Sequence, residues 1–157
     1  MLKNAQLKAM IWGKSFFNSC QTTGVSHIMN DPVREYLERL SYADYIIEGG
    51  VEYLLTSWES TVSSITEGEV PDYHQYVKSM DRRRILEETL ALIPLNQQAW
   101  YHQRVDEADH QLKQHLTVSE QPLCGPAVAA EKGYTPDRQW WYFHRPRRVN
   151  GAWPNAR

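Results

Sequence analysis

The sequence predicts an all-α fold, a small bundle of about four helices with an extended, aromatic-rich C-terminal arm. From about position 30 to position 116, apolar residues recur at intervals of three and four, as on the inner face of amphipathic helices. Prolines and capping residues divide this region into segments joined by short connections, which favour antiparallel neighbours. After Thr117, prolines and glycines recur every few residues, so no long helix can follow.

The N-terminal region differs in charge from the rest of the chain. Residues 1–30 contain three lysines and no acidic residue. Asp31 and Pro32 then form a typical helix opening, because an Asx residue caps the first turn and proline fits the first helical position. We therefore expect residues 1–28 to be a leader or loosely packed extension. A single helical domain is expected over 29–157, a size at which one domain is the usual outcome.

The first helical pattern covers residues 33–65 and passes through Gly49 and Gly50 without losing phase. It fits either one kinked helix or two helices that meet at the glycines, each of which costs about 1 kcal/mol relative to alanine in a helix interior. The preserved phase favours a nearly continuous path. We expect the helix to end near Glu67 and Gly68.

Three further segments are predicted before the arm. Pro71 and Asp72 open a helix whose apolar phase shifts near Met80, so a break is expected there, with Asp81 capping a new helix. Pro94 closes that helix, and the last one is expected over about 95–116. The inner face of the last helix is predicted to comprise Tyr101, Val105, Ala108, Leu112 and Leu116.

The arm, residues 117–157, concentrates large aromatic and basic side chains. Within fourteen residues it holds five aromatic rings and three arginines, namely Trp140, Trp141, Tyr142, Phe143, Trp153, Arg145, Arg147 and Arg148. A short extended piece is expected at 139–144. Because exposing so many rings to water is unfavourable, we expect the arm to pack on its own helices, with Trp100 as part of the receiving surface. Two alternatives remain, a protein-docking arm and a nucleic-acid site in which the arginines meet phosphates and the tryptophans stack on bases.

The charge distribution points to a protein partner. Residues 31–130 hold 8 Lys/Arg against 17 Asp/Glu, a balance of −9, whereas residues 131–157 have a balance of +4. An acidic body would repel a long polyanion, which argues against nucleic acid, and would attract a basic protein. The predicted contact residues are Glu48, Glu52, Glu59, Glu67, Glu69 and Asp72 of the body, and Trp140, Trp141, Arg145, Arg147 and Arg148 of the arm.

We therefore expect a non-enzymatic protein-interaction module, such as a bacterial immunity or inhibitor-type protein or an accessory subunit. The sequence has no glycine-rich phosphate loop, and no cofactor is predicted. The Arg82-Arg83-Arg84 run is interpreted as solvated charge.

The alternative is a metal-dependent helical enzyme. His102, Asp106 and His110 are spaced four residues apart on one predicted helix, and Asp109 could add an oxygen; imidazole with carboxylate suits zinc or iron. No matching ligand pair is found on another helix, which a bundle metal site needs.

The sequence also indicates a compartment. No apolar run approaches the roughly 20 residues of a membrane span. Cys20 and Cys124 are the two cysteines, and they lie far apart outside any ligand spacing. We therefore expect a reduced cytoplasmic environment and no membrane partner.

Overall fold

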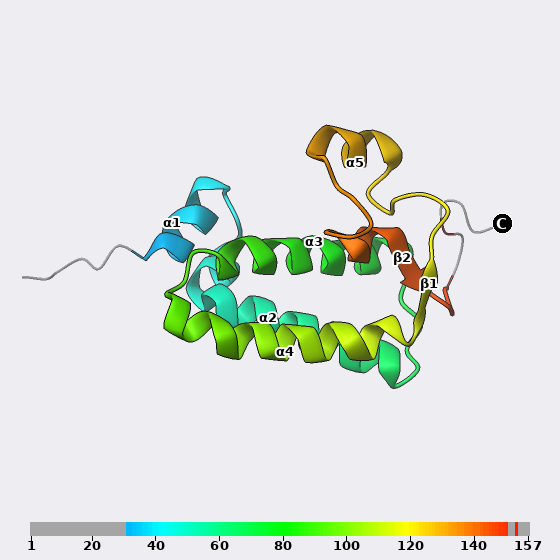
Figure 1. Ribbon diagram of the computed structural model, residues 1–157, viewed down its shortest axis with the longest axis horizontal. Coiled ribbons are helices and arrows are strands. Elements are labelled where there is room, and N and C mark those ends of the chain that lie inside the picture. The colour runs from blue at the N-terminus through cyan, green and yellow to red at the C-terminus, as the bar shows by residue number, and fades with distance from the viewer. Residues whose placement is uncertain (1–30, 151–152, 154–157) are drawn as a thin grey trace, which may run out of the picture.

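The computed structural model describes residues 31–150 and Trp153 (Figure 1). The described elements are α1 (Pro32–Arg39), α2 (Asp44–Thr66), α3 (Tyr73–Leu90), α4 (Leu95–Lys113), β1 (Leu116–Val118), α5 (Pro126–Lys132), the 3-10 helix η1 (Trp140–Phe143) and β2 (His144–Pro146). Within these residues the strands form a single two-stranded antiparallel pair, so the predicted helical class is confirmed. The predicted leader, residues 1–28, lies outside the described part of the chain.

The three long helices form the body of the molecule. Figure 1 shows α2, α3 and α4 running alongside one another, with α1 at one end and the strand pair at the other. α2 packs against both α3 and α4, and α1 packs against α2. α5 stands apart above α3, and η1 returns the chain to α3. No helix among residues 31–150 has both the length and the apolar character needed to cross a membrane.

The predicted helix starts at residues 31–32 and 71–72 are confirmed. The Asp31 carboxylate accepts hydrogen bonds from the amides of Val33 and Arg34, and Pro32 occupies the first turn. The Asp72 carboxylate accepts from the amide of Gln75 at 2.9 Å. Each cap satisfies backbone donors that the helix itself leaves unpaired. The start of each helix can therefore be predicted from a few neighbouring residues.

The nearly continuous helix predicted over 33–65 is wrong in one respect. The chain breaks earlier, after Arg39, where Ser41 adopts a φ of 55° and the Tyr42 amide donates to the Leu37 carbonyl. The expected distortion at the glycines is present within α2, since Gly50 has φ 53° and ψ −143°. Glycine adopts this positive φ readily, whereas the backbone of a residue with a Cβ would be strained there, although the space around Gly50 is open.

The break predicted near Met80 is also wrong, because α3 is continuous from Tyr73 to Leu90. The shift in apolar phase arises because α3 is covered on two sides, by α2 and by the arm, so Tyr76, Met80 and Leu86 are all buried. Asp81 is therefore not a cap. α4 ends at Lys113, three residues before the predicted end, and Leu116 begins β1 instead.

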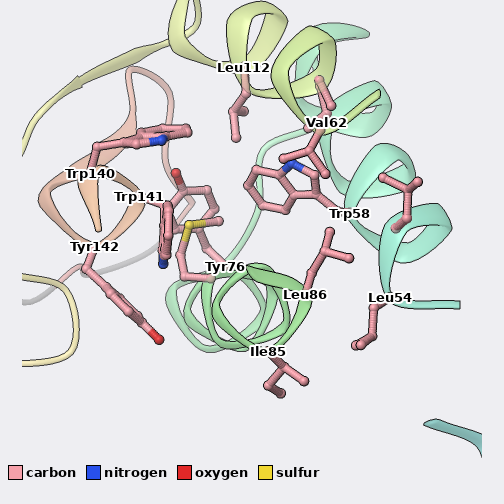
Figure 2. Packing of buried hydrophobic residues seen from close by; sticks show 14 of the residues in the cluster. Leu54, Trp58, Val62, Tyr76, Ile85, Leu86, Leu112, Trp140, Trp141 and Tyr142 are labelled. Atoms are coloured by element: carbon pink, nitrogen blue, oxygen red, sulfur yellow. The ribbon is translucent and has the colours of Figure 1, made fainter. Parts of the chain in front are cut away.

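The C-terminal arm packs on the body, as predicted. Trp140, Trp141, Tyr142 and Trp153 are buried, and Figure 2 shows the first three rings beside α3, in the same cluster as Trp58 of α2. The piece expected to be extended over 139–144 is mostly the 3-10 helix η1, and the strand follows it. β2 pairs with β1 in the register Leu116↔Pro146, which fixes the arm beside the end of α4.

Candidate functional site

The six acidic residues predicted to bind a partner do not form one continuous face. Glu48 and Glu52 are exposed and Glu59 is half-buried, all three on α2. The others lie at the far end of α2 and beyond it. In that second group Glu67 ends α2, Glu69 belongs to the connection, and Asp72 is occupied as the α3 cap.

Arg104 of α4 organises the α2 carboxylates. Its guanidinium forms ion pairs with Glu59 at 2.6 Å and with Glu52 at 3.2 Å. The hydrogen bonds to Glu59 are the largest contribution that raises the pKa of Arg104. The same guanidinium lies 4.5 Å from the centre of the Trp100 ring, a cation–π contact. We call this group, Glu52, Glu59, Trp100 and Arg104, the acidic face.

Trp100 is not covered by the arm, contrary to expectation. Its side chain remains 53% exposed, because the arm docks near the other end of α4, beside Lys113. Tyr101 contacts the Trp100 ring edge to face at 4.7 Å, and Arg104 lies over one side of the indole. Sequence reasoning singled out Trp100 but missed Arg104. The four-residue spacing of the two on one helix was the available signal.

The proposed metal ligands of the alternative hypothesis are not brought together as a metal site. His102, Asp106 and His110 are all exposed along α4. Among residues 31–150 and Trp153, no group of three or more His, Cys, Asp or Glu side chains is arranged to hold a metal ion. The three residues line the rim of a cleft of about 400 Å³ between α4 and the arm.

Asp109, the possible fourth ligand, points inward and is 6% exposed. Its carboxylate accepts hydrogen bonds from Trp58 Nε1 at 2.9 Å, from Arg83 Nε at 3.2 Å and from Arg83 Nη2 at 2.9 Å. Arg83 also pairs with Glu87 at 2.8 Å, and its guanidinium lies 4.5 Å from the centre of the Trp141 ring. Burial lowers the pKa of Arg83, but Asp109 and Glu87 outweigh it and raise the pKa overall.

The Arg82-Arg83-Arg84 run is thus not simply solvated. Arg83 is 4% exposed, and Arg82 and Arg84 are half-buried. Because Arg83 binds Trp141 of the arm and Asp109 of α4, it holds three parts of the chain together. This role is structural.

The arm residues proposed to bind a partner separate into two groups. Trp140 and Trp141 are buried, with Lys113 lying 4.3 Å from the centre of the Trp140 ring. Arg145 is half-buried, and Arg147 donates a hydrogen bond to the Leu116 carbonyl at 3.1 Å. The tryptophan rings are therefore occupied by this molecule's own core, and stacking on bases would require the arm to undock. Arg148 is exposed.

A third cluster, which sequence reasoning missed, lies between α1, α3 and the arm. The Tyr36 hydroxyl donates to Glu88, and the Tyr142 hydroxyl donates to Asp81 at 2.5 Å. Burial and then Glu88 raise the pKa of Tyr36 to about 12. Burial and then Asp81 raise the pKa of Tyr142. Perturbed groups beside a pocket are typical of functional sites as well as of structural networks.

Comparisons of the chain with protein-family models, with curated proteins and with solved structures find no match. Function must therefore be inferred from these clusters.

Proposed function

We propose that the protein is a non-enzymatic protein-interaction module that binds a basic protein partner through the acidic face. The observation that carries the proposal is Trp100, a large ring left 53% exposed on a helix and held in place by Arg104. Tryptophan and arginine are the residues most enriched in interface hot spots. A side chain that is already immobilised loses little rotamer freedom on binding, which favours affinity.

The charges of this face favour a cationic partner. Glu52 and Glu59 contribute two carboxylates against the single guanidinium of Arg104, which leaves an excess of negative charge. An arginine or lysine of the partner could contact the part of the Trp100 ring that Arg104 leaves open and pair with the exposed Glu52. Such complementarity mainly accelerates association and selects the partner.

A basic substrate cleft, such as that of a nuclease, has the matching chemistry. The finer proposal is accordingly an immunity or inhibitor-type protein, or an accessory subunit, acting in the cytoplasm. It is supported by the acidic balance of residues 31–130 and by the low cysteine content.

The test uses a photo-crosslinking amino acid in place of Trp100 and, as a matched control, in place of exposed Lys78 on α3. Cross-linked proteins from the native host are identified by mass spectrometry. The identified partner is then produced pure, and its affinity for unlabelled wild type and Trp100→Ala is measured at several salt concentrations. We expect a basic partner cross-linked only from position 100, with affinity that falls as salt rises. Trp100→Ala should weaken it about 30-fold, the loss of one hot spot of roughly 2 kcal/mol.

Equal cross-linking from both positions would refute the proposal, as would a pure partner that binds Trp100→Ala as tightly as wild type. Circular dichroism of the variant serves as the folding control. Since Trp100 is half exposed and lies outside the core, its removal should leave the helix content unchanged.

A further inference from the structure

A pocket of about 580 Å³ opens between the α1–α2 connection, α3 and α5. This volume lies within the range of small-molecule sites in proteins. Tyr42, Tyr134 and Tyr142 contribute aromatic walls, and the aliphatic side chains of Leu40 and Val128 stand at its edge, 46% and 42% exposed.

The aromatic walls are held in fixed positions. Tyr134 and Tyr142 stack with a centroid distance of 5.1 Å and an interplanar angle of 8°. The Tyr142 hydroxyl is tied to Asp81 at 2.5 Å, and the Tyr42 hydroxyl accepts a hydrogen bond from Arg84 at 3.3 Å. Tyr142 is covered by this packing, so half-buried Tyr134 and Tyr42 offer the accessible ring surface.

The charge left uncompensated in the pocket is negative. Arg84 donates to both oxygens of Glu88, at 2.8 and 2.7 Å, so these two charges offset each other. Lys132 at the rim lies 3.8 Å from its neighbour Glu131, and both side chains are more than half exposed. Asp81 has no cation within ion-pairing distance among the described residues, and it accepts its hydrogen bond from the neutral Tyr142 hydroxyl.

Two neighbouring groups, Cys124 and Tyr134, have raised pKa values. The pKa of the Cys124 thiol is raised mainly by burial; a backbone hydrogen bond opposes the shift, and the Asp81 charge adds to it. The pKa of Tyr134 is raised mainly by burial; Arg84 opposes the shift, while Glu88 and Asp81 add to it. In both cases burial is the main cause, and the Asp81 charge adds to the shift.

We propose that this pocket binds a small organic ammonium group, either of a free amine or of a lysine side chain presented by another molecule. The open rings of Tyr42 and Tyr134 would contact the cation, and Asp81 would supply its counter-charge. Aromatic walls combined with a carboxylate form the usual environment for such cations. An anionic ligand would meet the carboxylates of Asp81 and Glu88, whereas Arg84 is already paired with Glu88 and Lys132 lies beside Glu131 at the rim. The pocket involves other elements than the acidic face, so the two proposals can fail separately.

The test is a titration of the full chain followed by amide NMR signals around Cys124, Val128 and Tyr134. The probes are n-butylammonium, the side-chain model Nα-acetyl-lysine amide, and the matched controls 1-butanol and butyrate. We expect saturable shifts with one or both ammonium probes and none with the controls. Binding of n-butylammonium alone would identify a free amine as the ligand. Binding of the lysine derivative would show that a lysine side chain fits.

Variants locate the site. Asp81→Asn keeps an acceptor for Tyr142 but removes the charge, and should weaken ammonium binding about tenfold. Tyr134→Leu should weaken it about fivefold, whereas Tyr134→Phe, which keeps the ring, should bind like wild type. Asp137→Asn, an exposed carboxylate outside the pocket, is the control and should have no effect. The absence of saturable ammonium binding, equal binding of butyrate, or unchanged binding by Asp81→Asn would each overturn the proposal.

Discussion

Replacing Asp109 by alanine should be among the most destabilising single substitutions in this chain. The carboxylate is 6% exposed and accepts hydrogen bonds from Trp58 and twice from Arg83. Its loss leaves the Arg83 guanidinium buried, with only Glu87, whose side chain is 52% exposed, as an ionic partner. It also leaves the buried Trp58 N–H without an acceptor.

The expected magnitude comes from these two losses. Removing one partner of a buried ion pair costs about 3–5 kcal/mol, and an orphaned buried N–H costs about 1–3 kcal/mol. Both losses come from one carboxylate and are not independent, so we expect a total of about 4–6 kcal/mol. Against a typical unfolding free energy of about 5–15 kcal/mol, this would leave the protein marginally folded.

The decisive comparison is with a double variant, Arg83→Met with Asp109→Leu. It removes both charges and fills the space with apolar groups, which is often neutral relative to a buried pair. The double variant should therefore be more stable than Asp109→Ala, although it changes one residue more. Urea unfolding followed by circular dichroism at 222 nm measures the free energy of unfolding, and an unchanged m-value confirms comparable unfolding transitions.

Asp106→Ala is the matched control, since Asp106 lies on the same helix and is exposed. Its unfolding free energy should stay within about 0.5 kcal/mol of wild type. The reasoning would be refuted if Asp109→Ala cost less than about 1 kcal/mol, or if the double variant lost as much as the two single variants added together.

Three other predictions concern the arm, the α2 kink and one tyrosine. Trp141→Ala should lower the unfolding free energy by about 3–5 kcal/mol and make the arm sensitive to limited proteolysis, because the ring is 2% exposed; retained protease resistance would contradict this. Gly50→Ala should cost about 1–3 kcal/mol in thermal unfolding, because φ 53° with ψ −143° is strained for any residue with a Cβ, whereas an unchanged Tm would show that the kink relaxes. The raised pKa of Tyr36 favours its neutral form in the folded state, so its contribution is complete below pH 10 and is lost as the pH rises through about 12. Absorbance at 295 nm should show that Tyr36→Phe removes a late-titrating tyrosine, and loss of one that titrates near pH 10 would contradict the assignment to Glu88.

The parts of the fold that could be predicted depend on local chemistry. Some helix boundaries depend only on residues within one helical turn, so one sequence is enough to predict them. Examples are the caps Asp31 and Asp72 and the helix stop at Pro94. The break at Ser41 was not predicted, because the apolar residues before and after it follow the helical spacing of a single continuous helix. A turn residue with positive φ that is neither glycine nor asparagine gives little warning.

Of the candidate site, sequence reasoning found Trp100 and the α2 carboxylates but not their connection. Arg104 of α4 contacts Glu52 and Glu59 of α2, which are 52 and 45 residues away in the sequence. The spacing of apolar residues along one helix cannot predict such a contact between two helices. The same holds for Tyr142 and Asp81, which are 61 residues apart. The expected cover for Trp100 failed for a related reason, since the pairing of β1 with β2 sets where the arm lies, and that pairing is also non-local.

The Arg82-Arg83-Arg84 run was expected to be solvated, but it makes internal contacts because α3 has neighbours on several sides. Successive residues on an α-helix point about 100° apart, so Arg82, Arg83 and Arg84 face three different directions. Arg82 donates to Ser57 of α2, Arg83 binds Asp109 of α4, and Arg84 binds Glu88 and Tyr42. A solvated patch requires one open side for all three, whereas α3 has neighbours on several sides. The burial of Arg83 is compensated by its ion pair with Asp109. Replacing both residues by apolar ones should therefore destabilise the protein less than replacing Asp109 alone.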